Sequence, residues 1–149
     1  MKIPTMLRLF AWCFSLSSMF WMQATFSAPL NLPCPSQYPD DRQLSKMRGD
    51  GWYAPSSGVA GSALNQAGAL TGTADQNGEL RGSDLPSGKG RRFEFDGTAD
   101  DGDKWVFCNY ESGRADVRLM YPLPVQAKRC ETDEKRLHER VLAAATRCI

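Results

Sequence analysis

Apolar and polar side chains alternate along two runs in the second half of the chain, Arg91 to Gly97 and Lys104 to Tyr110. Alternation with a period of two is typical of β-strands, whose successive side chains point to opposite faces. A third run, Val117 to Tyr121, follows and is closed by prolines, which interrupt strand pairing. We therefore predict a three-stranded antiparallel meander over residues 91–121, with the second run as its central strand.

Both faces of the predicted central strand are apolar. Trp105 and Phe107 point to one face, whereas Val106, Cys108 and Tyr110 point to the other. A strand with two apolar faces must be covered on both sides. The sequence therefore predicts a second element that packs against the face carrying Cys108.

The segment from Glu131 to Cys148 is the natural candidate for that cover. Thr132 can cap a helix there. Apolar residues then recur at helical spacing, at Leu137, Val141, Ala144, Ala145 and Cys148. We predict an amphipathic C-terminal helix, so the expected fold class is α+β: a small antiparallel sheet covered by this helix.

Residues 1–27 have the pattern of a secretory signal peptide. Lys2 and Arg8 supply positive charge, and the run from Leu9 to Met22 is almost wholly apolar or small. This run is shorter than the roughly 20 apolar residues that a transmembrane helix needs. We expect cleavage, no membrane anchor afterwards, and a single exported domain over residues 28–149.

The remaining cysteines number four, and an even number in an exported protein predicts disulfides: Cys34, Cys108, Cys130 and Cys148. Their spacing lacks the close pairs of a zinc site. Cys130 and Cys148 would lie roughly 27 Å apart along the predicted helix, too far to bond. Two arrangements stay open: Cys34–Cys148 with Cys108–Cys130, or Cys34–Cys130 with Cys108–Cys148.

Net charge bears on the class of partner. Without Lys2 and Arg8, 16 basic residues stand against 17 acidic ones, a net charge near −1. This balance gives no electrostatic basis for binding nucleic acid or an anionic membrane. We therefore expect neither as a partner.

The segment from 96 to 104 carries clustered aspartates, Asp96, Asp100, Asp101 and Asp103. A helix-loop-helix calcium site with Gly102 as its central glycine would need a carboxylate where Cys108 stands, so that register fails. We predict a hydrophilic turn, and whether this acidic turn, Asp96 to Asp103, binds calcium stays open.

The segment from Ala54 to Gly90 is rich in small and polar residues and poor in bulky ones. We expect irregular structure with short strands at Ala67 to Thr71 and Glu79 to Gly82, joined by a turn at Asn77-Gly78. Mobile loops often carry binding surfaces, so this segment is the predicted location of one. Trp52 and Trp105 are instead expected in the core.

Several short motifs occur in order along the chain: Cys34-Pro35, Gly51-Trp52, GELRGSDL (78–85), WVFCNY (105–110) and LPVQAKRC (123–130). In this succession the chain resembles a family of small, uncharacterised exported proteins of Gram-negative bacteria. The resemblance implies a periplasmic location and an even cysteine framework, and it supplies no catalytic residues. Gly72-Thr73-Ala74 stands where the family usually has a proline, so the resemblance does not define the conformation of this loop.

Enzymatic signatures are scarce in the sequence. His138 is the one histidine, and the sequence has no G-x-S-x-G elbow and no phosphate-binding glycine loop between a strand and a helix. We predict a non-catalytic protein without metal or cofactor. Its expected role is a periplasmic interaction module, either an envelope-assembly partner or an inhibitor or immunity protein of a cell-wall-directed enzyme.

The alternative is a small hydrolase of glycan or peptidoglycan. Such enzymes use two carboxylates, and the candidates are Glu94, Asp96, Asp100, Asp101 and Asp103.

Overall fold

The computed structural model of the chain describes residues 28–74, 78–95, 102–113 and 115–149. Within these ranges the chain forms one helix and eight strands. In chain order they are β1 (Leu30–Cys34), α1 (Asp41–Gly49), β2 (Leu64–Thr71), β3 (Ser83–Asp84), β4 (Gly90–Glu94), β5 (Lys104–Ser112), β6 (Ala115–Pro122), β7 (Arg129–Leu137) and β8 (Arg140–Cys148).

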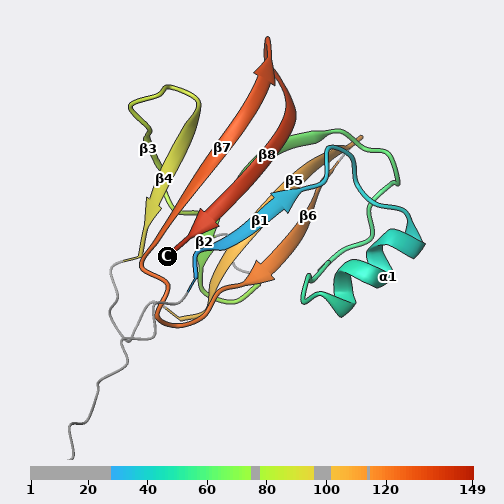
Figure 1. Cartoon of the computed structure of the whole chain (residues 1–149). Coiled ribbons are helices and arrows are strands. Elements are labelled where there is room, and N and C mark those ends of the chain that lie inside the picture. The colour runs from blue at the N-terminus through green and yellow to red at the C-terminus, as the bar shows by residue number, and fades with distance from the viewer. Residues whose placement is uncertain (1–27, 75–77, 96–101, 114) are drawn as a thin grey trace, which may run out of the picture.

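The strands form two antiparallel sheets. The larger sheet has five strands in the order β1-β8-β7-β4-β3, and the smaller sheet has three in the order β2-β5-β6. Figure 1 shows the two sheets stacked as two layers, with α1 to one side. The fold is mostly β, and the predicted α+β class is wrong.

The core lies between the two layers. β5 directs Val106, Cys108 and Tyr110 toward the larger sheet, and all three side chains are completely buried. The opposite face of β5 carries Phe107, which belongs to a second, smaller apolar cluster. The prediction that both faces of this strand are covered is confirmed, but the cover over Cys108 is a sheet.

The predicted C-terminal helix is absent from the described part of the chain, because its residues form the β7–β8 hairpin. β7 and β8 pair with each other, and β4 and β1 extend the pairing on either side. Thr132 and Thr146 share a buried hydrogen bond of 3.0 Å across the hairpin. Tertiary contacts of this kind override helix propensity, and β-branched threonine suits a strand.

The predicted meander is correct for two of its three strands. β5 and β6 form an antiparallel hairpin, but β4 pairs with β7 in the larger sheet. Phe93 of β4 lies opposite Cys130 of β7, and both are buried. Arg92 forms an ion pair with Glu131 at 2.9 Å. Alternation located these strands, but it carries no information about which strands are neighbours.

Both disulfides join residues that the sequence analysis did not pair. Cys34 bonds to Cys108 and so ties β1 of the larger sheet to β5 of the smaller one. Cys130 bonds to Cys148, which lies directly opposite it in the β7–β8 register, with 4.1 Å between the Cα atoms. The helix predicted for residues 131–148 would keep these two cysteines apart, whereas a hairpin brings the two ends of its segment together. Two disulfides are consistent with an oxidising, extracytoplasmic location.

Tyr110 is the largest fully buried side chain in the described part of the chain. Its hydroxyl donates to the backbone oxygen of Pro35 at 3.0 Å, and its ring meets Tyr38 edge-on with centroids 5.4 Å apart. Burial raises the pKa of Tyr110 well above its ordinary value near 10, and the neighbouring Tyr38 adds to the shift. The ionised form is disfavoured because the core cannot solvate its charge.

This shift predicts a loss of stability at alkaline pH. The folded-state pKa lies above the unfolded-state value, so the contribution of Tyr110 is fully present below pH 10 and is lost as pH rises above it. Urea midpoints measured across this range should fall more steeply for the wild type than for Tyr110→Phe. Parallel curves for the two proteins would show that Tyr110 does not ionise on unfolding.

Candidate functional site

The hairpin of β7 and β8 extends past the strands on either side of it. β4 pairs with β7 only as far as Asp133, and β1 pairs with β8 only from Ala144 onward. Residues 135–143 therefore extend beyond the flanking strands of the larger sheet, and we call them the hairpin tip. Figure 1 shows the end of this hairpin standing clear of the neighbouring elements.

The hairpin ends in a two-residue turn, His138 and Glu139, between the paired residues Leu137 and Arg140. His138 has a φ of 56°, in the left-handed region. This conformation costs a residue other than glycine about 1 kcal/mol, but tight hairpin turns need a positive φ to follow the twist of the strands. The pairing of the flanking strands, and not a favoured turn residue, therefore imposes this turn.

Two leucines of the hairpin tip are exposed to solvent. Leu137 is 58% exposed and Leu142 is 38% exposed. Leu142 is the extra residue of a β-bulge opposite Lys135 and Arg136, and bulges of this kind redirect side chains. Val141 is buried in the core and fixes the tip to the body of the protein. The tip therefore presents apolar side chains from a supported position.

Glu134 directly precedes the hairpin tip and fixes the base of the tip, which we call its root. Its Oε1 accepts a hydrogen bond from the backbone N–H of Ala67 in β2 at 3.3 Å. Its Oε2 accepts from Nε and one Nη of Arg136 at 2.8 and 2.5 Å. The Glu134 side chain is 11% exposed and that of Arg136 is 45% exposed. One carboxylate of the larger sheet thus holds the guanidinium of Arg136 and also bonds to the smaller sheet.

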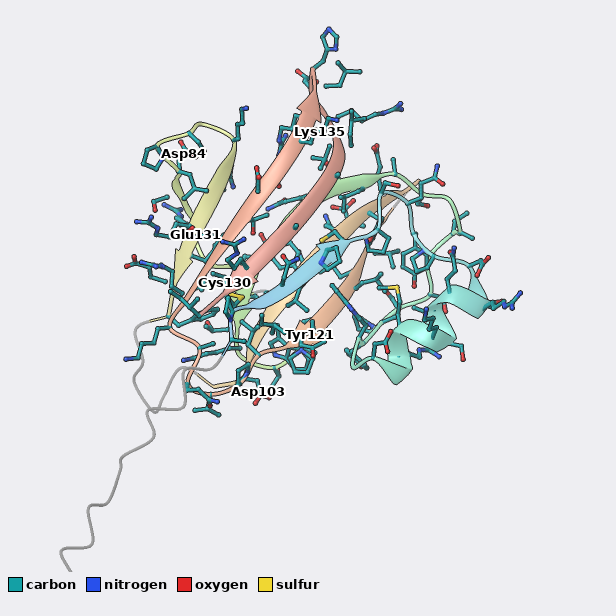
Figure 2. The ribbon with its side chains drawn as sticks, in the orientation of Figure 1. Asp84, Asp103, Tyr121, Cys130, Glu131 and Lys135 are labelled. Carbon is teal, nitrogen blue, oxygen red and sulfur yellow. A yellow bond between two sulfur atoms is a disulfide. The ribbon has the colours of Figure 1, made fainter. Side chains whose placement is uncertain are left out.

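A groove of about 680 Å³ lies beside this root, between the β3–β4 turn and β7. Figure 2 shows Asp84 on one side of this region and Lys135 on the other. The charged residues that line the groove are basic and acidic: Lys89, Arg91, Lys135 and Arg136, and Asp84, Asp133 and Glu134. Among the described residues, no ion pair engages Lys89 or Lys135, so both ammonium groups can reach a partner.

Two of the five carboxylates predicted to carry chemistry lie in the described ranges. Glu94 is exposed in β4 and Asp103 is exposed just before β5, whereas Asp96, Asp100 and Asp101 lie outside the described residues, as does most of the acidic turn considered for calcium. His138, the one histidine of the sequence, lies exposed in the hairpin turn. The four cysteines are all in disulfides.

Of the two tryptophans expected in the core, Trp52 lies there, whereas Trp105 lies only partly buried beside the smaller apolar cluster. Trp52 is buried and packs edge-on against Tyr121, with ring centroids 5.5 Å apart. Trp105 is half-buried, and its Nε1 donates to the backbone oxygen of Gly72 at 3.0 Å. The indole therefore holds the glycine-rich segment against β5.

The segment predicted as a mobile binding surface, Ala54 to Gly90, is held at several points. Its central part forms β2, and Glu79 bridges to Leu70, so the expected pairing exists only as an isolated bridge. Tyr38 donates from its backbone to Ser62 at 2.7 Å. The last residues of the segment line the groove, and only there does the predicted surface meet the observed site.

Sequence reasoning missed the hairpin tip itself. The turn has neither glycine nor asparagine, the residues that usually mark a two-residue hairpin. One signal was present: Cys130, Thr132 and Glu134 alternate with exposed or half-exposed polar residues, as in a strand. That run is short, and the helical spacing of the apolar residues after it obscured the pattern.

The hairpin tip carries side chains that can bind a partner protein. Exposed leucines can enter an apolar pocket, and a fixed arginine can pair with a carboxylate.

In the described ranges, no group of three or more His, Cys, Asp or Glu side chains could hold a metal ion. No helix in those ranges is long and apolar enough to cross a membrane. Compared with known proteins, the chain matches no family model, no curated protein and no solved structure.

Proposed function

We propose that this chain is a non-catalytic protein-binding module of the bacterial periplasm, and that the hairpin tip is its contact surface. The observation that carries the proposal is the projection of the tip beyond the flanking strands, with Leu137 exposed at its end. A narrow convex element fits a concave site on a partner. The role it fits best is an inhibitor or immunity protein of a cell-wall-directed enzyme.

The predicted compartment supports this role. The two disulfides agree with an oxidising location, and residues 1–27, which lie outside the described residues, have the pattern of a secretory signal. The resemblance to small exported proteins of Gram-negative bacteria points to the periplasm. A cell-wall-directed enzyme works in or next to this compartment.

The rigidity of the hairpin tip also supports binding. Val141 is anchored in the core, Glu134 bonds to β2, and the Cys130–Cys148 disulfide closes the other end of the hairpin. A surface that is ordered before it binds loses less conformational entropy on association. The exposed end of Leu137 can therefore act as an anchor without a large ordering cost.

The test is capture by the oxidised protein immobilised on a support, from an extracytoplasmic extract of the source cells. We expect the wild type to retain one partner protein near stoichiometry, and Leu137→Asp to retain roughly one tenth or less, as for an interface anchor. Val125→Asp is the matched control. Val125 is 86% exposed and precedes β7, so it lies at the opposite end of the sheet from the tip.

Equal capture by all three proteins, or no capture by any, would contradict the assignment of the tip. Muropeptide release from purified cell wall by the protein alone, at any pH of a series, would instead make it a hydrolase. The carboxylate alternative would then replace this proposal.

A further inference from the structure

The basic residues of the chain are concentrated on the larger sheet. Residues 83–95 and 128–149, which contain β3, β4, β7 and β8, carry nine basic and six acidic residues, a net charge of +3. The rest of the chain from residue 28 carries seven basic and eleven acidic residues, a net charge of −4. Such an uneven distribution steers the positive side of a protein toward a negatively charged site on its partner.

The hairpin tip lies at the end of this positive side. It contains Lys135, Arg136 and Arg140 against the single acid Glu139. Lys135 and Arg140 form no ion pair with any other described residue, so no side chain in the described ranges neutralises their charges. Arg140 is paired with Leu137, and Lys135 and Arg136 directly precede it in β7. The tip therefore carries an apolar contact and several cations on one narrow element.

Arg136 can bind a second carboxylate in addition to that of Glu134. A guanidinium has five N–H donors, and Glu134 accepts from Nε and one Nη on one edge of it. The edge formed by the two Nη atoms can bind another carboxylate through two parallel hydrogen bonds. Because Glu134 is also bonded to β2, the guanidinium of Arg136 is held in one orientation before a partner binds.

We propose that the partner is a glycan-cleaving enzyme and that the hairpin tip inserts into its carboxylate-lined cleft. This inference rests on the proposed function and names the class of its target. Such enzymes place two carboxyl groups on either side of the bond they cleave, and one of the two is kept protonated by apolar surroundings. Arg136 pairs with the ionised carboxylate, and Leu137 contacts the apolar wall.

The test measures inhibition with two probes. One is lysozyme, whose cleft carries a glutamic acid and an aspartate, and the other is the muropeptide-releasing activity of the source cells' own extracytoplasmic extract. We expect the oxidised wild type to inhibit at least one probe, with an inhibition constant that rises with salt. Arg136→Gln and Arg140→Gln should each raise that constant, the former by roughly tenfold or more.

Lys128→Gln is the matched control, because it removes one exposed cation at the opposite end of β7. Its inhibition constant should stay within about twofold of the wild type, a change too small to indicate a direct contact. Thermal unfolding of each variant shows whether the fold is kept.

Failure to inhibit either probe, or equal loss of inhibition in Arg136→Gln and Lys128→Gln, would overturn the inference. If a partner of another class is captured and Leu137→Asp abolishes that capture, the proposed function stands and only the target class is wrong.

Discussion

Replacing Cys34 and Cys108 together by alanine is expected to lower the free energy of unfolding by about 4 kcal/mol, because the bond closes a long loop in the unfolded chain. The two residues are separated by 74 positions. This bond is also the covalent link between β1 in the larger sheet and β5 in the smaller one. Guanidinium unfolding of the oxidised wild type and the double variant measures the difference.

The second disulfide provides the matched comparison. Replacing Cys130 and Cys148 by alanine also removes two buried sulfur atoms, but these residues are separated by only 18 positions. The shorter loop predicts a smaller loss, about 3 kcal/mol. A larger loss from the second pair than from the first would contradict loop length as the source of the difference, and would point to packing within the larger sheet.

Substitution of Gly90 by alanine is expected to cost about 3 kcal/mol, at the upper end of what overpacking usually costs. A Cβ at Gly90 would lie 1.8 Å from the backbone oxygen of Thr132 and 2.9 Å from its carbonyl carbon. Thr132 cannot retreat easily, because it is buried and its strand is paired on both sides. β4 must therefore separate from β7 at this point.

The matched control is Gly49→Ala at the end of α1, where nothing lies within 4 Å of an added Cβ. Urea unfolding should show no loss of stability for this variant. Amide hydrogen exchange offers a second readout, because Glu134 donates from its backbone to Lys89 at 2.8 Å. That amide should exchange faster in Gly90→Ala. Unchanged stability and exchange would mean that the strand pair tolerates the methyl group.

The alternation of side chains predicted β4, β5 and β6 closely, because each has a buried face that repeats every second residue. Val106, Cys108 and Tyr110 were assigned to one face of β5, and all three are buried there. Strand neighbours could not be predicted in the same way. Pairing of β4 with β7 depends on contacts between Phe93 and Cys130, which are far apart in the sequence.

The error at residues 131–148 has a different origin. Ala144, Cys148 and Val141 are buried, as a helix would also bury them. In the hairpin, Ala144 and Cys148 share one face of β8, and the bulge at Leu142 shifts the alternation so that Val141 faces the core as well. The spacing of buried residues in this bulged strand coincides with the spacing on one face of a helix, so apolar spacing alone could not separate helix from strand.

The candidate site could not be predicted from side-chain chemistry alone. Arg136 and Glu134 read as ordinary surface charges in the sequence, and only the crossing of β2 beneath the hairpin brings Ala67 to Glu134. The position of Leu137 depends on where β1 and β4 stop pairing. The groove requires β3 and β4 to flank β7, a neighbourhood that local sequence does not encode.

The pairing of β1 with β8 places the first and last described strands side by side at one edge of the larger sheet. A chain made from its N-terminus must leave β1 without its neighbour until β8 has been synthesised. Pairings between such distant residues form slowly, because a long loop must close first. The final assembly of the larger sheet therefore waits until β8 has been made, and an export route that carries unfolded chains would have time to act before the protein becomes compact.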